Sequence, residues 1–167
     1  DIISRRSFFK QALAFSAVSA IPSFWIPKAN AASVASRMSA NDKVRVAFIG
    51  IGNRGADISQ RMFKTGLCEV VALCDVDMGA PHTQKIISMF PDVPRFQDFR
   101  QMFDKMADKI DAVTVCTPDH SHFPITIEAM AHGKHVYVEK PMARTFQEVE
   151  LMMRAEKKFG VVTQMGN

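Results

Sequence analysis

The sequence has few cysteines and no arrangement of cysteine and histidine that is typical of a metal site. Its three cysteines, Cys68, Cys74 and Cys116, form no Cys-x-x-Cys pair and no cluster with histidine, so we predict no bound metal. Cys74 and Cys116 lie in apolar, strand-like runs and are expected to be buried thiols. Such thiols can stay unpaired even in an oxidising compartment, because burial keeps them away from reagents.

The chain also lacks an unbroken apolar run of the ~20 residues that a membrane-spanning helix needs. Its moderately apolar stretch, from Ala12 to Ile26, is interrupted by Pro22. A basic segment with Arg5 and Arg6 precedes this stretch and resembles the twin-arginine export motif, and small residues follow at 29–31.

This order of basic, apolar and small residues predicts a removable signal over residues 1–31. We therefore expect the twin-arginine export machinery as a partner, a periplasmic or otherwise exported protein, and no stable membrane anchor. An amphipathic helix or an uncleaved anchor is the alternative. Cleavage would be excluded if the exported protein still contained Arg5 and Arg6.

Little excess positive charge is left outside the predicted signal. The whole chain has 21 basic and 17 acidic residues, and residues 1–31 hold four of the basic and one of the acidic ones. The remainder has 17 basic against 16 acidic residues, a net charge of +1. It contains no basic run and no basic patch interleaved with aromatic residues, so we predict no nucleic-acid partner.

Strand-like and helix-like runs alternate from residue 43 onward, after a small, polar linker over residues 32–42. The expected strands are 44–49, 69–74, 94–96, 111–116, 135–138 and 161–164, and the expected helices are 53–65, 79–89, 97–107, 122–132 and 145–159. A capping box at Thr145 and Glu148 and a glycine at each of 133 and 160 mark helix ends. The alternation predicts an α/β domain over residues 43–167, with a doubly wound parallel sheet of the Rossmann type.

A glycine-rich turn follows the first expected strand. Gly50, Gly52 and Gly55 form a Gly-x-Gly-x-x-Gly pattern between this strand and the next expected helix. In such a turn the first glycine permits a tight bend and the second lets a pyrophosphate approach the backbone. The third lets the helix pack close to the strand. Because the helix start also offers free N–H groups to phosphates, a dinucleotide site is predicted here.

An acidic residue follows the second expected strand. Asp75 lies 20 residues after Gly55, about where a carboxylate reaches a ribose 2′-hydroxyl. Arg54 could contact the phosphates or the 2′-phosphate of NADP. Asp75 would repel that 2′-phosphate, however, and Val76 offers no basic clamp. NAD is therefore the predicted cofactor, and NADP is less favoured.

Two later loops carry polar residues where a parallel sheet binds ligands. One reads Thr-Pro-Asp-His-Ser-His over residues 117–122, and the other reads Glu-Lys-Pro over residues 139–141. Neighbouring strand residues point to opposite faces, so Glu139 and Lys140 are poorly placed to pair with each other. We expect the Lys140 ammonium to hold a substrate oxygen and to stabilise developing negative charge, instead of forming a surface ion pair.

The histidines offer no further site. His120 and His122 lack a third ligand and are weak evidence for a metal. His82, His132 and His135 are expected to be ordinary surface or strand-edge histidines.

Three motifs in this order and spacing resemble the Gfo/Idh/MocA oxidoreductase family over about residues 43–167: the glycine turn, Thr-Pro-x-x-x-His at 117–122 and Glu-Lys-Pro at 139–141. The resemblance implies contacts to the dinucleotide from Gly50, Gly52, Asn53, Arg54, Gly55, Asp75, Thr117, His122, Glu139, Lys140 and Asn167. It places Glu139 and Lys140 beside the nicotinamide and the substrate. The expected action of its ammonium on a substrate oxygen makes Lys140 the predicted catalytic residue. The resemblance also implies a cis peptide bond before Pro141.

The resemblance further implies a second α/β domain that supplies much of the substrate pocket and an acid/base histidine. We expect this chain, from Asp1 to Asn167, to be an N-terminal fragment without that domain. The expected function is oxidation or reduction of a sugar, polyol or related cyclic alcohol by a protein that is a homo-oligomer at full length. An NAD-dependent glycosidase is the alternative. Exported relatives of that type, however, have a motif similar to Glu-Val-Pro where this chain has Glu-Lys-Pro. A non-catalytic nucleotide- or sugar-binding module is the third possibility.

Overall fold

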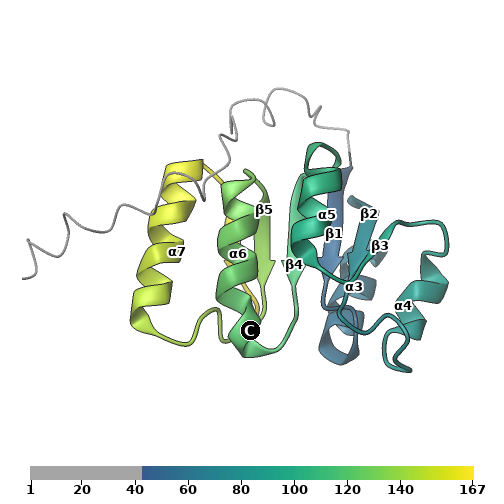
Figure 1. The fold of residues 1–167 in the computed structure, drawn as a ribbon. Helices are drawn as coiled ribbons and strands as arrows, with labels where there is room; N and C mark the ends of the chain where they lie inside the picture. Colours follow the sequence, from purple (N-terminus) through teal and green to yellow (C-terminus); the bar gives the residue numbers. More distant parts are fainter. Residues whose placement is uncertain (1–42) are drawn as a thin grey trace, which may run out of the picture.

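The computed structural model describes residues 43–167 (Figure 1), so the predicted signal over residues 1–31 and the predicted linker over residues 32–42 lie outside the described residues. The strands are β1 (Val44–Ile49), β2 (Cys68–Cys74), β3 (Arg95–Phe96), β4 (Ala112–Val115), β5 (His135–Val138) and β6 (Thr163–Met165). The helices are α3 (Asn53–Lys64), α4 (Gln84–Met89), α5 (Phe99–Met106), α6 (His122–Ala131) and α7 (Phe146–Phe159). Within this part of the chain, no helix is both long and apolar enough to cross a membrane.

The strands form one six-stranded sheet in the order β3-β2-β1-β4-β5-β6. All neighbouring strands are parallel. The order reverses between β1 and β4, and ligands of such sheets bind outside the carboxyl ends of the strands at this switch point. The predicted doubly wound α/β fold is therefore confirmed.

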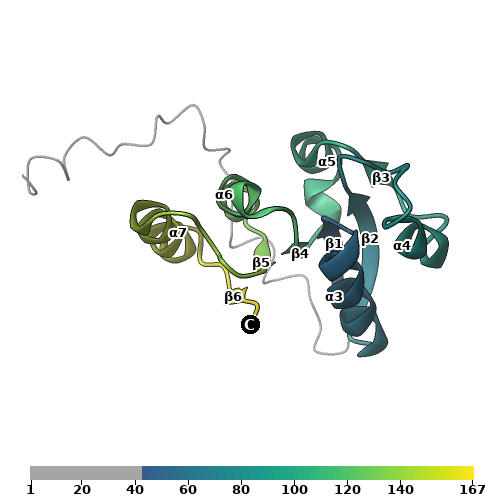
Figure 2. The ribbon, with the colours of Figure 1, turned by 90° about the horizontal axis from the view of Figure 1, so that it is seen from below.

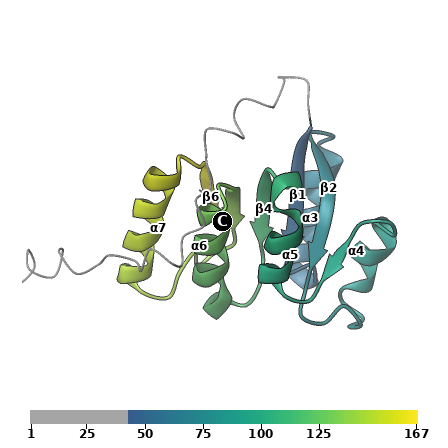
Figure 3. The same ribbon diagram turned by 45° about the horizontal axis from the view of Figure 1, so that its top comes forward.

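Helices cover both faces of the sheet, as Figures 2 and 3 show. Along β1, Val46 and Phe48 pack into the apolar cluster that holds α3 and α4, whereas Ala47 and Ile49 pack into the cluster that holds α5, α6 and α7. A strand buried on both faces explains the apolar run at 44–49. Burial of each large side chain, such as Phe48, contributes about 1.5–3 kcal/mol to folding.

The expected helix over residues 79–89 is wrong in its first half, because residues 78–83 form turns and a bend and α4 begins only at Gln84. Asp77 stabilises this segment by accepting a hydrogen bond at Oδ1 from the Gly79 N–H, at 3.1 Å. Pro81 disfavours helical geometry at the residue before it. The side chain of Thr83 is buried and donates to the Ala80 carbonyl at 2.8 Å, which ends the turns.

Other boundaries shift for local reasons. α5 begins at Phe99 and not at residue 97, because Asp98 caps it by accepting from the Arg100 N–H at 2.9 Å. β6 begins at Thr163 and not at residue 161, since the Val161 N–H donates back to the Glu156 carbonyl of α7. The remaining expected elements agree with the structure to within two residues. The predicted capping box of α7 is present.

Three charged residues meet at the amino ends of β1, β4 and β5, on the edge opposite the switch-point crevice. Asp111 is buried and accepts from Arg45 Nε at 2.9 Å and Nη2 at 2.6 Å, while the neighbouring Lys134 is also buried. Burial alone would raise the pKa of Asp111, but hydrogen bonds and charge from Arg45, together with the charge of Lys134, leave it lowered. Burial lowers the pKa of Lys134, and the charge of Asp111 offsets part of that effect.

We expect Asp111→Asn to lower the free energy of unfolding by about 2–3 kcal/mol, because it leaves buried positive charge without its partner. The value is below that of a fully buried pair, since Arg45 keeps some contact with water. Because folding lowers the pKa of Asp111, its contribution is complete above the unfolded value of about 3.9 and is lost as pH falls through the lower folded value. Urea unfolding at several pH values measures the difference in the free energy of unfolding between the wild type and Asp111→Asn. This difference should shrink below about pH 4.

Asp108→Asn is the matched control for this change. The Asp108 side chain is exposed, and Arg45 uses only its backbone carbonyl, at 3.3 Å. We expect this variant to unfold within about 0.5 kcal/mol of the wild type. An equal loss in both variants would contradict a special role for the buried carboxylate.

Candidate functional site

The glycine turn connects β1 to α3 and packs against the end of β4. Gly50 has φ +79°, and a Cβ at this position would lie 2.6 Å from the carbonyl carbon and oxygen of Cys116. A Cβ on Gly55 would overlap the carbonyl oxygen of Gly50. The first glycine is therefore required by the bend and the third by close packing of α3 on the turn, as the pattern predicted.

The turn presents a row of unused donors to the carboxyl edge of the sheet. Within residues 43–167, the backbone N–H groups of Gly52, Asn53 and Arg54 have no hydrogen-bond partner in the protein. The first turn of α3 contains no acidic residue. Consecutive free N–H groups at the positive end of a helix suit phosphate oxygens, so the residues present fit the pyrophosphate of a dinucleotide.

Asp75 holds the other side of this turn. Its Oδ2 accepts from the Ile51 N–H at 2.9 Å, and its Oδ1 accepts from the Asp77 N–H at 3.1 Å. Each carboxylate oxygen retains acceptor capacity, so Asp75 can also accept from a ribose hydroxyl. The carboxylate therefore fixes the shape of the turn in addition to its predicted role toward the ribose.

Glu139, directly after β5, is the centre of a polar cluster across the switch point. Its carboxylate is buried and accepts from Arg54 Nε at 3.1 Å and from the Tyr137 hydroxyl at 3.2 Å. The charge of Glu139 is the main cause of a raised pKa of Arg54. Arg54 thus reaches from α3 to β5, and it also pairs with Asp57 at 3.2 Å.

Lys140 is exposed at the same edge of the sheet and forms no salt bridge with any residue in the described part of the chain. The surface ion pair with Glu139 is not formed, since Glu139 faces Arg54. The peptide bond between Lys140 and Pro141 is cis, as the family resemblance implied. The ammonium group is left available to a ligand at the carboxyl edge.

His122 is buried and joins the loops after β4 and β5. Its Nε2 lies 2.7 Å from the Thr117 carbonyl oxygen, and its Nδ1 lies 2.6 Å from the Pro141 carbonyl oxygen. His122 is 1% exposed, and its two ring contacts hold the loops together. The contact with the dinucleotide that the resemblance implies for His122 stays a prediction. The Thr117 hydroxyl is also buried and has no protein partner among the described residues.

Two more features lie at this edge. Gly166 passes so close to β5 that a Cβ on it would lie 2.5 Å from the Tyr137 hydroxyl and 2.8 Å from Glu139 Oε1. Asn167, which follows it, is therefore placed beside the cluster around Glu139.

Burial, followed by the charge of Glu139, raises the pKa of Cys116 to about 12, which leaves this thiol protonated and unreactive at neutral pH.

The structure thus gathers the predicted residues along the carboxyl ends of β1, β2, β4 and β5. Sequence reasoning missed the role of Tyr137. Glu139 directly follows β5 and lies two residues after Tyr137, so the two-residue period of an extended chain was a usable signal. Sequence reasoning also missed that Arg54 pairs with Glu139, for which 85 residues of separation left no local signal.

Comparison with known proteins agrees with this geometry. Residues 44–167 match an oxidoreductase family with an NAD-binding Rossmann fold. The chain belongs to the Gfo/Idh/MocA oxidoreductase family. Its motifs at the glycine turn and in the loops after β4 and β5 therefore lie in the part of the chain that matches the NAD-binding Rossmann domain of this family.

Several known proteins are similar to this chain. An alpha-N-acetylgalactosaminidase of Bacteroides fragilis is 37% identical over 121 residues, which cover 68% of this chain and 28% of that protein. An alpha-N-acetylgalactosaminidase of Shewanella oneidensis is 34% identical over 164 residues, which cover 87% of this chain and 35% of that protein. This chain therefore spans only about a third of these relatives.

Among solved structures, myo-inositol 2-dehydrogenase of Lactobacillus plantarum is similar, with a TM-score of 0.65 and 26% identity. The match covers 75% of this chain and 36% of that protein. The shared part is again the nucleotide-binding domain, so the fold is common to proteins with different named activities, and the domain alone does not define a substrate.

Proposed function

We propose that this domain binds NAD at the turn between β1 and α3. The observation that carries the proposal is the row of free N–H groups at Gly52, Asn53 and Arg54, with Asp75 beside it. The N–H groups match a pyrophosphate, and Asp75 matches a ribose diol. A ribose 2′-phosphate would meet the negative charge of Asp75, which favours NAD over NADP.

We further propose that the full-length protein oxidises or reduces a carbinol carbon of a sugar, polyol or related cyclic alcohol. NAD supplies hydride acceptance or donation when it is bound. Lys140 is exposed next to the switch point, so its ammonium can donate to the carbinol oxygen and stabilise negative charge there. His122 fixes the loop that carries Lys140 by its contact with the Pro141 carbonyl.

The second candidate is a glycosidase that oxidises its sugar transiently, eliminates the glycoside and then reduces the product. The names of the relatives from Bacteroides fragilis and Shewanella oneidensis favour it. This chain has Glu-Lys-Pro at residues 139–141, where glycosidases of this kind have a motif similar to Glu-Val-Pro. The lysine in this motif favours the dehydrogenase. Both reactions require the same cofactor site, and both include hydride transfer between the nicotinamide and a carbinol carbon.

We expect the full-length protein to bind NAD at least tenfold more tightly than NADP, as measured by calorimetric titration. Asp75→Asn should reduce this preference, because it removes the negative charge that opposes the 2′-phosphate. A clear preference of the wild type for NADP would contradict the role given to Asp75.

Incubation of the full-length protein with sugars and with α-N-acetylgalactosaminides distinguishes the two candidate reactions. A dehydrogenase changes the nicotinamide absorbance in step with substrate use. A glycosidase of the second kind releases sugar with no net change in absorbance. NAD binding without either signal would instead support a non-catalytic module.

A further inference from the structure

His82 occupies the space next to the middle glycine of the turn. A Cβ on Gly52 would collide with the imidazole at Cδ2 and would lie 2.9 Å from its Nε2. Gly52 itself has φ −90° and ψ 161°, which any residue can adopt, so its backbone does not require glycine. The ring of His82 occupies the space that a side chain on Gly52 would need.

The segment that carries His82 is held at the turn by a chain of hydrogen bonds. Asp75 accepts from the Ile51 N–H in the turn and from the Asp77 N–H at the start of the segment. At the other end, buried Thr83 anchors the segment through the Ala80 carbonyl. His82 lies between Asp77 and Thr83. The hydrogen bonds on either side of it therefore help to keep its ring beside Gly52.

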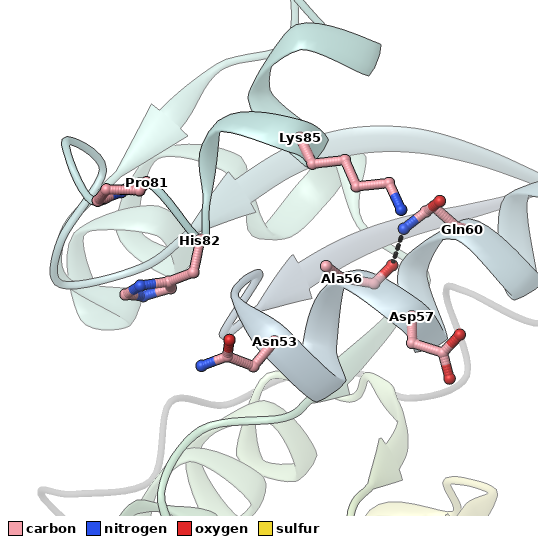
Figure 4. A pocket seen from close by; sticks show the side chains of 7 residues that line it. All are labelled: Asn53, Ala56, Asp57, Gln60, Pro81, His82 and Lys85. Carbon is pink, nitrogen blue, oxygen red and sulfur yellow. Dashed lines mark hydrogen bonds between the residues drawn. The ribbon is translucent and has the colours of Figure 1, made fainter.

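Figure 4 shows His82 and Asn53 at one end of a pocket of about 370 Å³ between α3 and the segment leading into α4. Lys85 lies farther along the pocket and has no salt bridge among residues 43–167. The acidic lining residue, Asp57, is paired with both Arg54 and Arg61. The end of the pocket next to Gly52 therefore offers donors and no uncompensated negative charge.

We propose that His82 is an additional cofactor-binding residue, whose imidazole N–H donates to a phosphate oxygen of the dinucleotide bound at Gly52. The inference rests on the proposed NAD site. A phosphate received by the free N–H groups of Gly52 and Asn53 lies beside the ring that contacts Gly52. The phosphate belongs either to the pyrophosphate, which NAD and NADP share, or to the 2′-position of NADP alone.

The test is calorimetric titration of the full-length protein with NAD and with NADP, using His82→Ala, His82→Gln and Lys85→Ala. A hydrogen bond to a charged group predicts about a tenfold loss of affinity in His82→Ala, and His82→Gln should recover part of it because an amide donor remains. Lys85→Ala should change affinity less than His82→Ala does, because its ammonium lies farther from Gly52. Urea unfolding of each variant checks that the exposed segment still folds.

Loss of affinity for both dinucleotides in His82→Ala assigns the contact to the pyrophosphate, and loss for NADP alone assigns it to the 2′-phosphate. Unchanged affinity for both in His82→Ala would overturn the inference. An equal loss in Lys85→Ala would also overturn it, since general positive charge would then suffice. Failure of the wild type to bind either dinucleotide is a separate result, which rejects the proposed NAD site itself.

Discussion

Gly52→Ala should leave the protein folded but weaken NAD binding at least 100-fold, whereas Gly55→Ala should strongly destabilise the fold. The sequence pattern assigns a different role to each of the three glycines, and the structure gives each a different neighbour. At Gly52 a methyl group meets only the side chain of exposed His82, which can swing away. That methyl group would also narrow the space, next to the ring of His82, through which the pyrophosphate approaches the N–H groups of the turn.

At Gly55 the added methyl group would overlap the Gly50 carbonyl oxygen. This atom belongs to the backbone of the turn and is fixed by β1 and α3, so it cannot move without separating the helix from the strand. We expect a loss of about 3 kcal/mol or more, a large part of the 5–15 kcal/mol that stabilises a typical domain. Gly50→Ala should be similar, because it combines a positive φ with the close Cys116 carbonyl.

Urea unfolding and NAD titration of the same variants measure both effects. Gly79→Ala is the control, since its nearest neighbour would be Asp77 Oδ1 at an ordinary 3.5 Å. The double variant Gly52→Ala/His82→Ala removes the collision with His82, and we expect it to remain unable to bind NAD. If binding returned in the double variant, displacement of His82 and not obstruction of the phosphate would explain the loss.

The sequence was sufficient to predict the fold because its signals are local and agree with one another. The apolar run at 44–49 is buried on both faces of the sheet, and the capping box at Thr145 marks the start of α7 as expected. Each of these features depends on residues within one turn or one strand. The fold, the glycine turn and the position of Asp75 therefore followed from pattern alone.

The sequence was insufficient where contacts join distant segments. The side chain of Arg54 was expected near phosphates, but a buried carboxylate 85 residues away holds it. His82 was expected to be an ordinary surface histidine. It reaches Gly52 because residues 79–83 form turns and a bend instead of the start of the predicted helix. This difference depends on Pro81 and on hydrogen bonds of Asp77 and Thr83. Periodicity carries no information about such pairings.

Lys140→Ala should lower kcat of the full-length protein by about 10²–10³-fold while changing its stability by less than about 0.5 kcal/mol. The side chain is exposed and forms no salt bridge in the described part of the chain, so folding loses nothing when it is removed. We expect turnover to slow because the variant lacks the ammonium group that would stabilise negative charge on the carbinol oxygen. The expectation holds for both candidate reactions, because each includes hydride transfer at a carbinol carbon whose oxygen Lys140 would contact.

Steady-state kinetics and NAD titration of Lys140→Ala separate its role from cofactor binding. NAD affinity should change less than kcat, since Lys140 acts on the substrate oxygen and the turn at Gly52 holds the phosphates. Lys157→Ala is the matched control, because Lys157 is exposed in the last turn of α7, away from the carboxyl edge where α7 begins. Unchanged turnover in Lys140→Ala would reject its catalytic role. A fall in NAD affinity as large as the fall in kcat would make Lys140 a cofactor-binding residue instead.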